Sequence, residues 1–125
     1  MRVAGLDREG FGGLLRSTNA GFGDDELDEY FKGLATDAGK RNALELYRSG
    51  DFEKLAGYRL AGLDVPVLLI WGAGDEFAPI AGAHRFQREL ADTQLVAIGD
   101  AGHFVWDEQP ERCTTALTSF LERLG

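Results

Sequence analysis

The spacing of hydrophobic residues changes near residue 63, and the two parts of the chain predict different kinds of structure. In the first part, Leu27, Tyr30, Phe31 and Leu34 recur at intervals of three and four residues, which predicts one face of an amphipathic helix. Three short helices are expected there, over residues 24–34, 38–47 and 51–58. Glycines interrupt residues 1–22, which are therefore predicted to be irregular, with room for a short helix over 11–16.

The second part predicts strands and helices in alternation. Residues 65–72 (VPVLLIWG) are almost entirely apolar, which predicts a strand buried on both faces and therefore a parallel sheet. A helix is expected over residues 80–90, a second strand over 94–98, and a last helix from Pro110. The apolar stripe of that last helix consists of Cys113, Leu117, Phe120, Leu121 and Leu124. This order of elements predicts a right-handed βαβ unit with a covering helix, and hence an α/β fold.

The composition is that of a globular domain, and it argues against several kinds of partner. The 125 residues fit one ordinary domain. The net charge of −8 disfavours nucleic acid and anionic membranes as partners, and no apolar run approaches the ~20 residues of a membrane span. The single cysteine, Cys113, fits a reducing compartment, so a cytoplasmic location is expected. One cysteine and two histidines argue against a structural zinc site.

Two residues that could carry chemistry follow the two predicted strands. Asp75 follows the first strand and His103 follows the second, each among glycines. Because the carboxyl ends of parallel strands meet at one edge of a sheet, these two side chains can lie together. A carboxylate bound to one imidazole nitrogen fixes the tautomer, and the other nitrogen is then free to act as a base.

Each of these residues also has an ordinary structural explanation. An aspartate after a strand is more often a turn or capping residue, and a histidine in a glycine-rich loop is more often solvated. His84 is expected on the surface, and the acidic pair Asp107 and Glu108 is expected to be solvated or to cap a helix. The phosphate-binding, HExxH and CxxC motifs do not occur in the sequence.

The combination of motifs over residues 60–124 resembles the C-terminal part of the α/β-hydrolase fold. The features that carry this resemblance are the PVLLIWG strand, the GAGD loop, the LVAI strand, the GHF loop and the EQPE helix entry. Residues 24–60 are similar to the helical cap of epoxide-hydrolase-like and haloalkane-dehalogenase-like members. The resemblance implies a helical cap segment over residues 1–60. It further implies that residues 61–125 form the last two parallel strands and covering helices of a hydrolase sheet.

The resemblance also implies roles for individual residues. Asp75 would be the catalytic acid and His103 the catalytic base, while Phe77 and Phe104 would border the substrate cavity. The nucleophile elbow and the oxyanion loop of the family have no counterpart, because no serine follows a buried strand. The nucleophile, Ser or Asp, is therefore expected outside this chain.

Two functions fit these observations. The first is a hydrolase component that acts on an ester, an epoxide or a carbon–halogen bond of a small-molecule substrate, with no cofactor. Its nucleophile would come from an N-terminal half or a partner chain, and the isolated chain would be inactive. The second is a non-catalytic remnant or binding module. The apolar strand over 67–71 has the strand over 94–98 on one edge only. This predicts that the isolated chain self-associates or is poorly folded, or that it binds the N-terminal hydrolase half.

Overall fold

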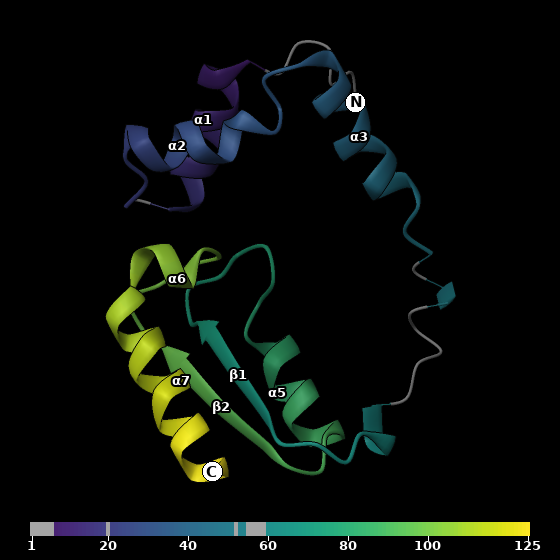
Figure 1. Cartoon of the computed structure of the whole chain (residues 1–125), viewed down its shortest axis with the longest axis vertical. Helices are drawn as coiled ribbons and strands as arrows, with labels where there is room; N and C mark the ends of the chain where they lie inside the picture. The colour runs from purple at the N-terminus through teal and green to yellow at the C-terminus, as the bar shows by residue number, and fades with distance from the viewer. Residues whose placement is uncertain (1–6, 20, 52, 55–59) are drawn as a thin grey trace. The chain divides into compact units, whose positions relative to one another are not determined.

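A computed structural model describes residues 7–19, 21–51, 53–54 and 60–125. The chain divides into two compact units, Met1–Tyr58 and Arg59–Gly125 (Figure 1). Most of the third expected helical piece, over residues 51–58, lies outside the described residues.

The first unit is helical. Its described helices are α1 (Arg8–Thr18), α2 (Asp24–Lys32) and α3 (Asp37–Arg48). The helices α2 and α3 agree with the helices expected over residues 24–34 and 38–47. Helix α3 begins at a cap in which the Thr36 hydroxyl accepts the N–H of Gly39 at 3.0 Å.

The prediction of an irregular segment was wrong over residues 8–18, where α1 is longer than the short helix allowed over 11–16 and runs through three glycines. The Asp7 carboxylate caps this helix by accepting the N–H of Gly10 at 2.8 Å. A side chain at Gly12 would lie 2.7 Å from the Cδ2 atom of Leu27, which is 1% exposed. Gly12 therefore lets α1 and α2 approach closely, and this packing compensates for the low helix propensity of glycine.

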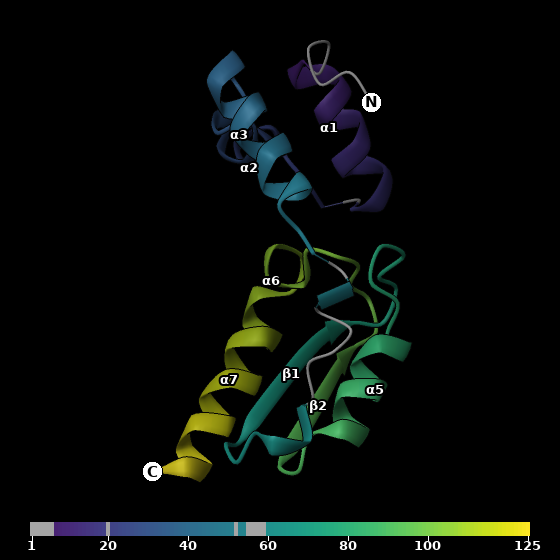
Figure 2. The ribbon, with the colours of Figure 1, turned by 90° about the vertical axis from the view of Figure 1, so that its right-hand side faces the viewer.

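The second unit contains a pair of parallel strands between helices. Its elements are η2 (Leu60–Gly62), β1 (Val67–Gly72), α5 (Ala81–Glu89), β2 (Thr93–Ile98), α6 (Val105–Glu108) and α7 (Pro110–Leu124). The strands pair in register from Val67 opposite Thr93 to Gly72 opposite Ile98. Helices α5 and α7 lie on opposite sides of the strand pair in both views (Figures 1 and 2). This is the predicted βαβ unit.

The core of the second unit lies between the strands and α7. Ile98, Ala101, Val105 and Cys113 are buried there, and Ile70 and Val96 pack against them. The apolar stripe predicted on α7 is only partly covered. Within that stripe Cys113 and Phe120 are buried, whereas Leu117, Leu121 and Leu124 are 38%, 55% and 50% exposed. Among the described residues β2 is the only strand beside β1, so the sheet is too narrow to cover the whole stripe.

The end of β1 lies against the loop that follows β2. A side chain at Gly72 would come within 2.6 Å of the carbonyl oxygen of Ala101, and closer still to that of Gly102. These are backbone atoms, which cannot turn away as the end of a side chain can. Glycine is therefore required at position 72 by the close approach of the two loops.

We expect Gly72→Ala to lower the free energy of unfolding by about 1–3 kcal/mol, because overpacking forces backbone to move. The matched control is Gly82→Ala in α5, where nothing lies within 4 Å of the added carbon. That substitution should raise stability by up to about 1 kcal/mol through helix propensity. Urea unfolding of the three chains measures both effects. A Gly72→Ala chain as stable as the wild type would contradict the described contact between the loops.

Candidate active site

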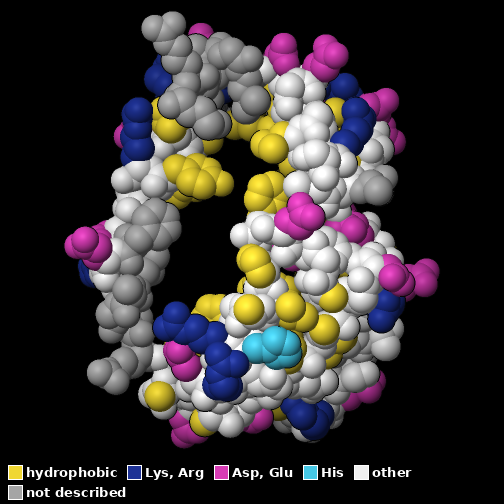
Figure 3. Space-filling model, turned by 180° about the vertical axis from the view of Figure 1, so that it is seen from behind, with side chains coloured by type: hydrophobic (Ala, Val, Ile, Leu, Met, Phe, Trp, Pro, Cys, Tyr) yellow, Lys and Arg dark blue, Asp and Glu magenta, His cyan; other side chains and the backbone are white. Residues whose placement is uncertain are grey.

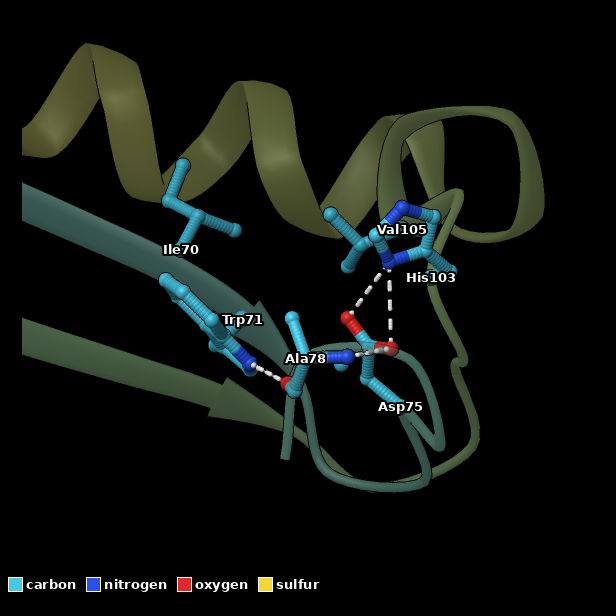
Figure 4. Close-up of a pocket in the computed structure, with 7 residues that line it drawn as sticks. Ile70, Trp71, Asp75, Ala78, His103 and Val105 are labelled. Atoms are coloured by element: carbon cyan, nitrogen blue, oxygen red, sulfur yellow. Dashed lines mark hydrogen bonds and ion pairs between the residues drawn. The ribbon is translucent and has the colours of Figure 1, made fainter. Parts of the chain in front are cut away.

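The first loop of the site leaves β1 and holds Asp75 in a tight turn. The Oδ1 atom of Asp75 accepts the backbone N–H groups of Phe77 at 2.9 Å and Ala78 at 2.8 Å. An aspartate that accepts backbone donors two and three residues ahead makes its own turn. The indole Nε1–H of Trp71 donates to the carbonyl of Ala78 at 2.7 Å and ties the far end of the loop to β1 (Figure 4).

The second loop leaves β2 and carries His103. Its backbone is joined to the first loop, because the N–H of Gly74 donates to the carbonyl of Ala101 at 3.0 Å. The residues before the histidine are buried, whereas 41% of the His103 side chain is exposed. The loop therefore anchors the histidine through its backbone and leaves part of the imidazole accessible.

The side chains of Asp75 and His103 meet at the carboxyl end of the strands. The Nδ1 atom of His103 lies 2.9 Å from Oδ2 of Asp75 and 3.1 Å from Oδ1 (Figure 4). The Asp75 side chain is 6% exposed, so the contact is shielded from water on the carboxylate side. The expectation that these two residues come together is confirmed.

The surroundings of Asp75 keep its carboxyl group ionised. Burial raises its pKa, but the N–H of Ala78, the His103 ring and the N–H of Phe77 lower it further, and the net pKa is below the ordinary value. An ionised carboxylate only accepts hydrogen bonds, so Nδ1 of His103 donates the proton that lies between the two groups. In the neutral imidazole with this tautomer, the Nε2 atom carries a lone pair and can accept a proton.

Two aromatic rings and an open hollow lie beside the histidine. The rings of Phe77 and Phe104 lie edge-on to His103, with centroids 5.2 Å and 5.3 Å away. An open hollow of about 180 Å³ is lined by Ile70, Trp71, Gly72, Asp75, Ala78, His103 and Val105. Phe77 and Phe104, which were expected to border the substrate cavity, lie beside His103 but are not among the residues that line this hollow. Hydrophobic side chains also reach the surface of this unit (Figure 3), and Phe77 is 55% exposed. The hollow can hold an apolar group of a small molecule beside the imidazole.

Cys113 and two of the three serines make structural hydrogen bonds. Cys113 is fully buried and its thiol donates to the carbonyl of Val105, and burial raises the pKa of this thiol. The hydroxyls of Ser17 and Ser49 donate to carbonyls at the ends of α1 and α3. Ser119 lies on α7. None of the three serines follows a strand in the described part of the chain.

Two residues that support the site were not predicted. Trp71 was interpreted only as part of an apolar strand, although an indole N–H near a loop usually finds an acceptor. Glu108 was expected to be solvated or to cap a helix. Its Oε1 atom instead accepts the N–H of Gly102 at 2.9 Å. His84 is exposed on α5, as predicted.

We expect the charge on Asp75 to make stability depend on pH. Because folding lowers its pKa, the carboxylate stabilises the fold above the ordinary aspartate pKa of about 3.9, and this contribution is lost as the pH falls through the folded pKa. At neutral pH Asp75→Asn should cost about 1–2 kcal/mol of unfolding free energy. The difference from the wild type should shrink between about pH 5 and pH 2.

The control for this measurement is Asp100→Asn, which removes an exposed carboxylate from the loop after β2. Unfolding by urea across the pH range should give parallel curves for this variant and the wild type. The interpretation of Asp75 would be wrong if the Asp75→Asn curve were also parallel to the wild type.

Comparisons with known proteins agree with this geometry. The chain is 32% identical over 76 residues to an uncharacterized hydrolase of Bacillus subtilis, YugF. It is 33% identical over 67 residues to a 2-hydroxy-6-oxononadienedioate/2-hydroxy-6-oxononatrienedioate hydrolase of Burkholderia vietnamiensis. These matches cover 61% and 54% of this chain. A solved serine hydrolase involved in carbazole degradation superposes with a TM-score of 0.76 and 27% identity over 93% of this chain.

The chain spans only part of these proteins: 27% and 23% of the two curated relatives and 47% of the solved structure. No described helix is long and apolar enough to cross a membrane. Residues 3–110 match the family described as alpha/beta hydrolase fold. With this match over most of its length, and with the parallel strands in register, the chain belongs to the α/β-hydrolase fold family.

Proposed function

We propose that this chain carries the acid and the histidine of a hydrolase and acts on a small-molecule substrate. The observation that carries the proposal is the hydrogen bond between His103 Nδ1 and Asp75 at the carboxyl ends of neighbouring parallel strands. In the proposed reaction a nucleophile attacks the substrate and forms a covalent intermediate. As the bond to the nucleophile forms, the ester, epoxide C–O or carbon–halogen bond of the substrate breaks. The Nε2 atom of His103 then takes a proton from water, and the resulting hydroxide attacks the intermediate, breaks its bond to the nucleophile and releases the product, while Asp75 stabilises the imidazolium.

Three bond types are open to a site of this kind: an ester, an epoxide and a carbon–halogen bond. The nucleophile separates them, because ester hydrolysis by this fold uses serine, whereas an aspartate would indicate the other two. The solved neighbour is a serine hydrolase, which favours serine as the nucleophile and argues against the epoxide and the carbon–halogen bond. In the proposal Phe77 and Phe104 contact the apolar part of the substrate, because their rings lie next to the ring of His103. The chemistry requires no cofactor.

We also propose that the nucleophile is supplied by an N-terminal hydrolase half. The surfaces of the second unit support such a partner. A hollow on this unit is lined by Glu111, Arg112, Thr115, Ala116 and Ser119 of α7 together with Gln94 and Val96 of β2. At 100° per residue, Leu117 and Leu121 point away from Thr115 and Ser119, and therefore toward the side of β1. The exposed leucines, and the edge of β1 that pairs with no other strand among the described residues, thus favour further apolar structure beside β1.

The cytoplasm remains the expected compartment, because Cys113 is a free thiol.

The function is tested by activity toward p-nitrophenyl acetate. The isolated chain should show little turnover, because it lacks a nucleophile and oxyanion donors in the proposal. This chain matches only one part of the carbazole-degrading hydrolase. A fusion of this chain to the remaining part of that hydrolase should gain turnover. In that fusion His103→Ala should lower kcat on the order of 10⁶-fold, whereas His84→Ala should not change it.

Three results would speak against the proposal. A fast, His103-dependent burst from the isolated chain would mean that the chain has its own nucleophile. Turnover of the fusion that survives His103→Ala would mean that His103 is not the base. A folded but inactive fusion would favour a non-catalytic remnant or binding module.

Without its partner the chain should self-associate through the uncovered surface of the second unit. Sedimentation velocity at micromolar concentrations should therefore find species larger than a monomer. Replacing both Leu117 and Leu121 with lysine should shift the chain toward monomer, while lysines at Thr115 and Ser119 should not. A wild-type monomer with one sharp, cooperative melting transition would mean that the chain closes its own core, and the partner proposal would be abandoned.

A further inference from the structure

The peptide group between Ala101 and Gly102 is hydrogen-bonded at both ends. Its carbonyl oxygen accepts the N–H of Gly74, in the loop that carries Asp75, at 3.0 Å. Its own N–H donates to Oε1 of Glu108, in α6, at 2.9 Å. Ala101 and Gly102 are both buried, so each of these polar groups depends on protein partners. One peptide plane therefore connects the acid loop to Glu108.

This plane comes directly before His103 in the chain. Gly102 has no side chain to restrict its dihedral angles, so the backbone before the histidine needs an external restraint. The carbonyls of Ala101 and Gly102 already lie against Gly72, which blocks movement toward the strand. On the other side the carboxylate of Glu108 holds the N–H end of the plane. A charged acceptor makes this hydrogen bond stronger than one to a neutral group.

We propose that Glu108 is a positioning residue that keeps His103 on Asp75 by fixing the Ala101–Gly102 peptide. Glu108 acts on His103 through the backbone, because it restrains the peptide group that precedes the histidine. Without its carboxylate the N–H of Gly102 is left unpaired, and the peptide turns to reach water. That rotation moves His103 away from the carboxylate of Asp75. The catalytic consequence rests on the proposed function, whereas the positioning itself does not.

The test follows the tautomer of His103 by nuclear magnetic resonance of the full chain labelled with ¹⁵N-histidine. The sequence has two histidines, so exposed His84 serves as an internal reference in every spectrum. At about pH 8, above the ordinary histidine pKa, the wild-type His103 should carry its proton on Nδ1. In Glu108→Ala the His103 signals should move toward the pattern of His84.

Two further variants separate positioning from a general loss of structure. Glu108→Gln keeps an acceptor oxygen at the same reach, so it should retain most of the wild-type His103 pattern. Glu108→Asp is one methylene shorter and should lose it, and this variant decides the question if Glu108→Ala does not fold. The matched control is Glu111→Ala, which removes an exposed carboxylate at the start of α7 and should leave His103 unchanged.

The proposal is overturned if His103 keeps the wild-type tautomer in both Glu108→Ala and Glu108→Asp. It is also overturned if Glu108→Gln loses the tautomer as fully as Glu108→Ala, because an acceptor at position 108 would then not be what holds the loop. These spectra need no substrate and no nucleophile. An inactive fusion would therefore count against the proposed function and leave this result intact.

Discussion

The hydrogen bond between His103 and Asp75 joins two loops that leave neighbouring strands, and the rest of the site is arranged around it. It requires an ionised carboxylate that is shielded from water, which the N–H groups of Phe77 and Ala78 stabilise. It also requires that the loops approach closely, and Gly72 allows this because it has no side chain. The result is an imidazole with one nitrogen occupied and the other accessible, which is the arrangement that general base catalysis needs.

The meeting of Asp75 and His103 could be predicted from the sequence because it follows from topology. In a parallel βαβ unit the ends of the two strands lie side by side, so residues just after each strand become neighbours. The supporting contacts could not be predicted in the same way. Glu108 and the Trp71 indole bind backbone groups of the loops, and backbone positions leave no pattern of residue types in a sequence.

The errors elsewhere in the chain have a common physical origin in packing between elements. Glycines in residues 8–18 indicate an interrupted helix when only local propensity is considered. The contact between Gly12 and Leu27 makes the same glycine favourable in α1. The apolar spacing of residues in α7 correctly predicted a helix. Periodicity alone, however, does not determine which other elements bury each of its apolar side chains. Leu121 is 55% exposed because the described sheet does not extend beneath it.

The central claim is that Asp75 and His103 interact as a pair, and a double-mutant cycle measures this directly. The unfolding free energies of the wild type, Asp75→Asn, His103→Gln and the double variant give the coupling between the two side chains. A hydrogen bond to a shielded carboxylate should give a coupling above about 1 kcal/mol at neutral pH. Effects of the two substitutions that add to within about 0.3 kcal/mol would contradict the account.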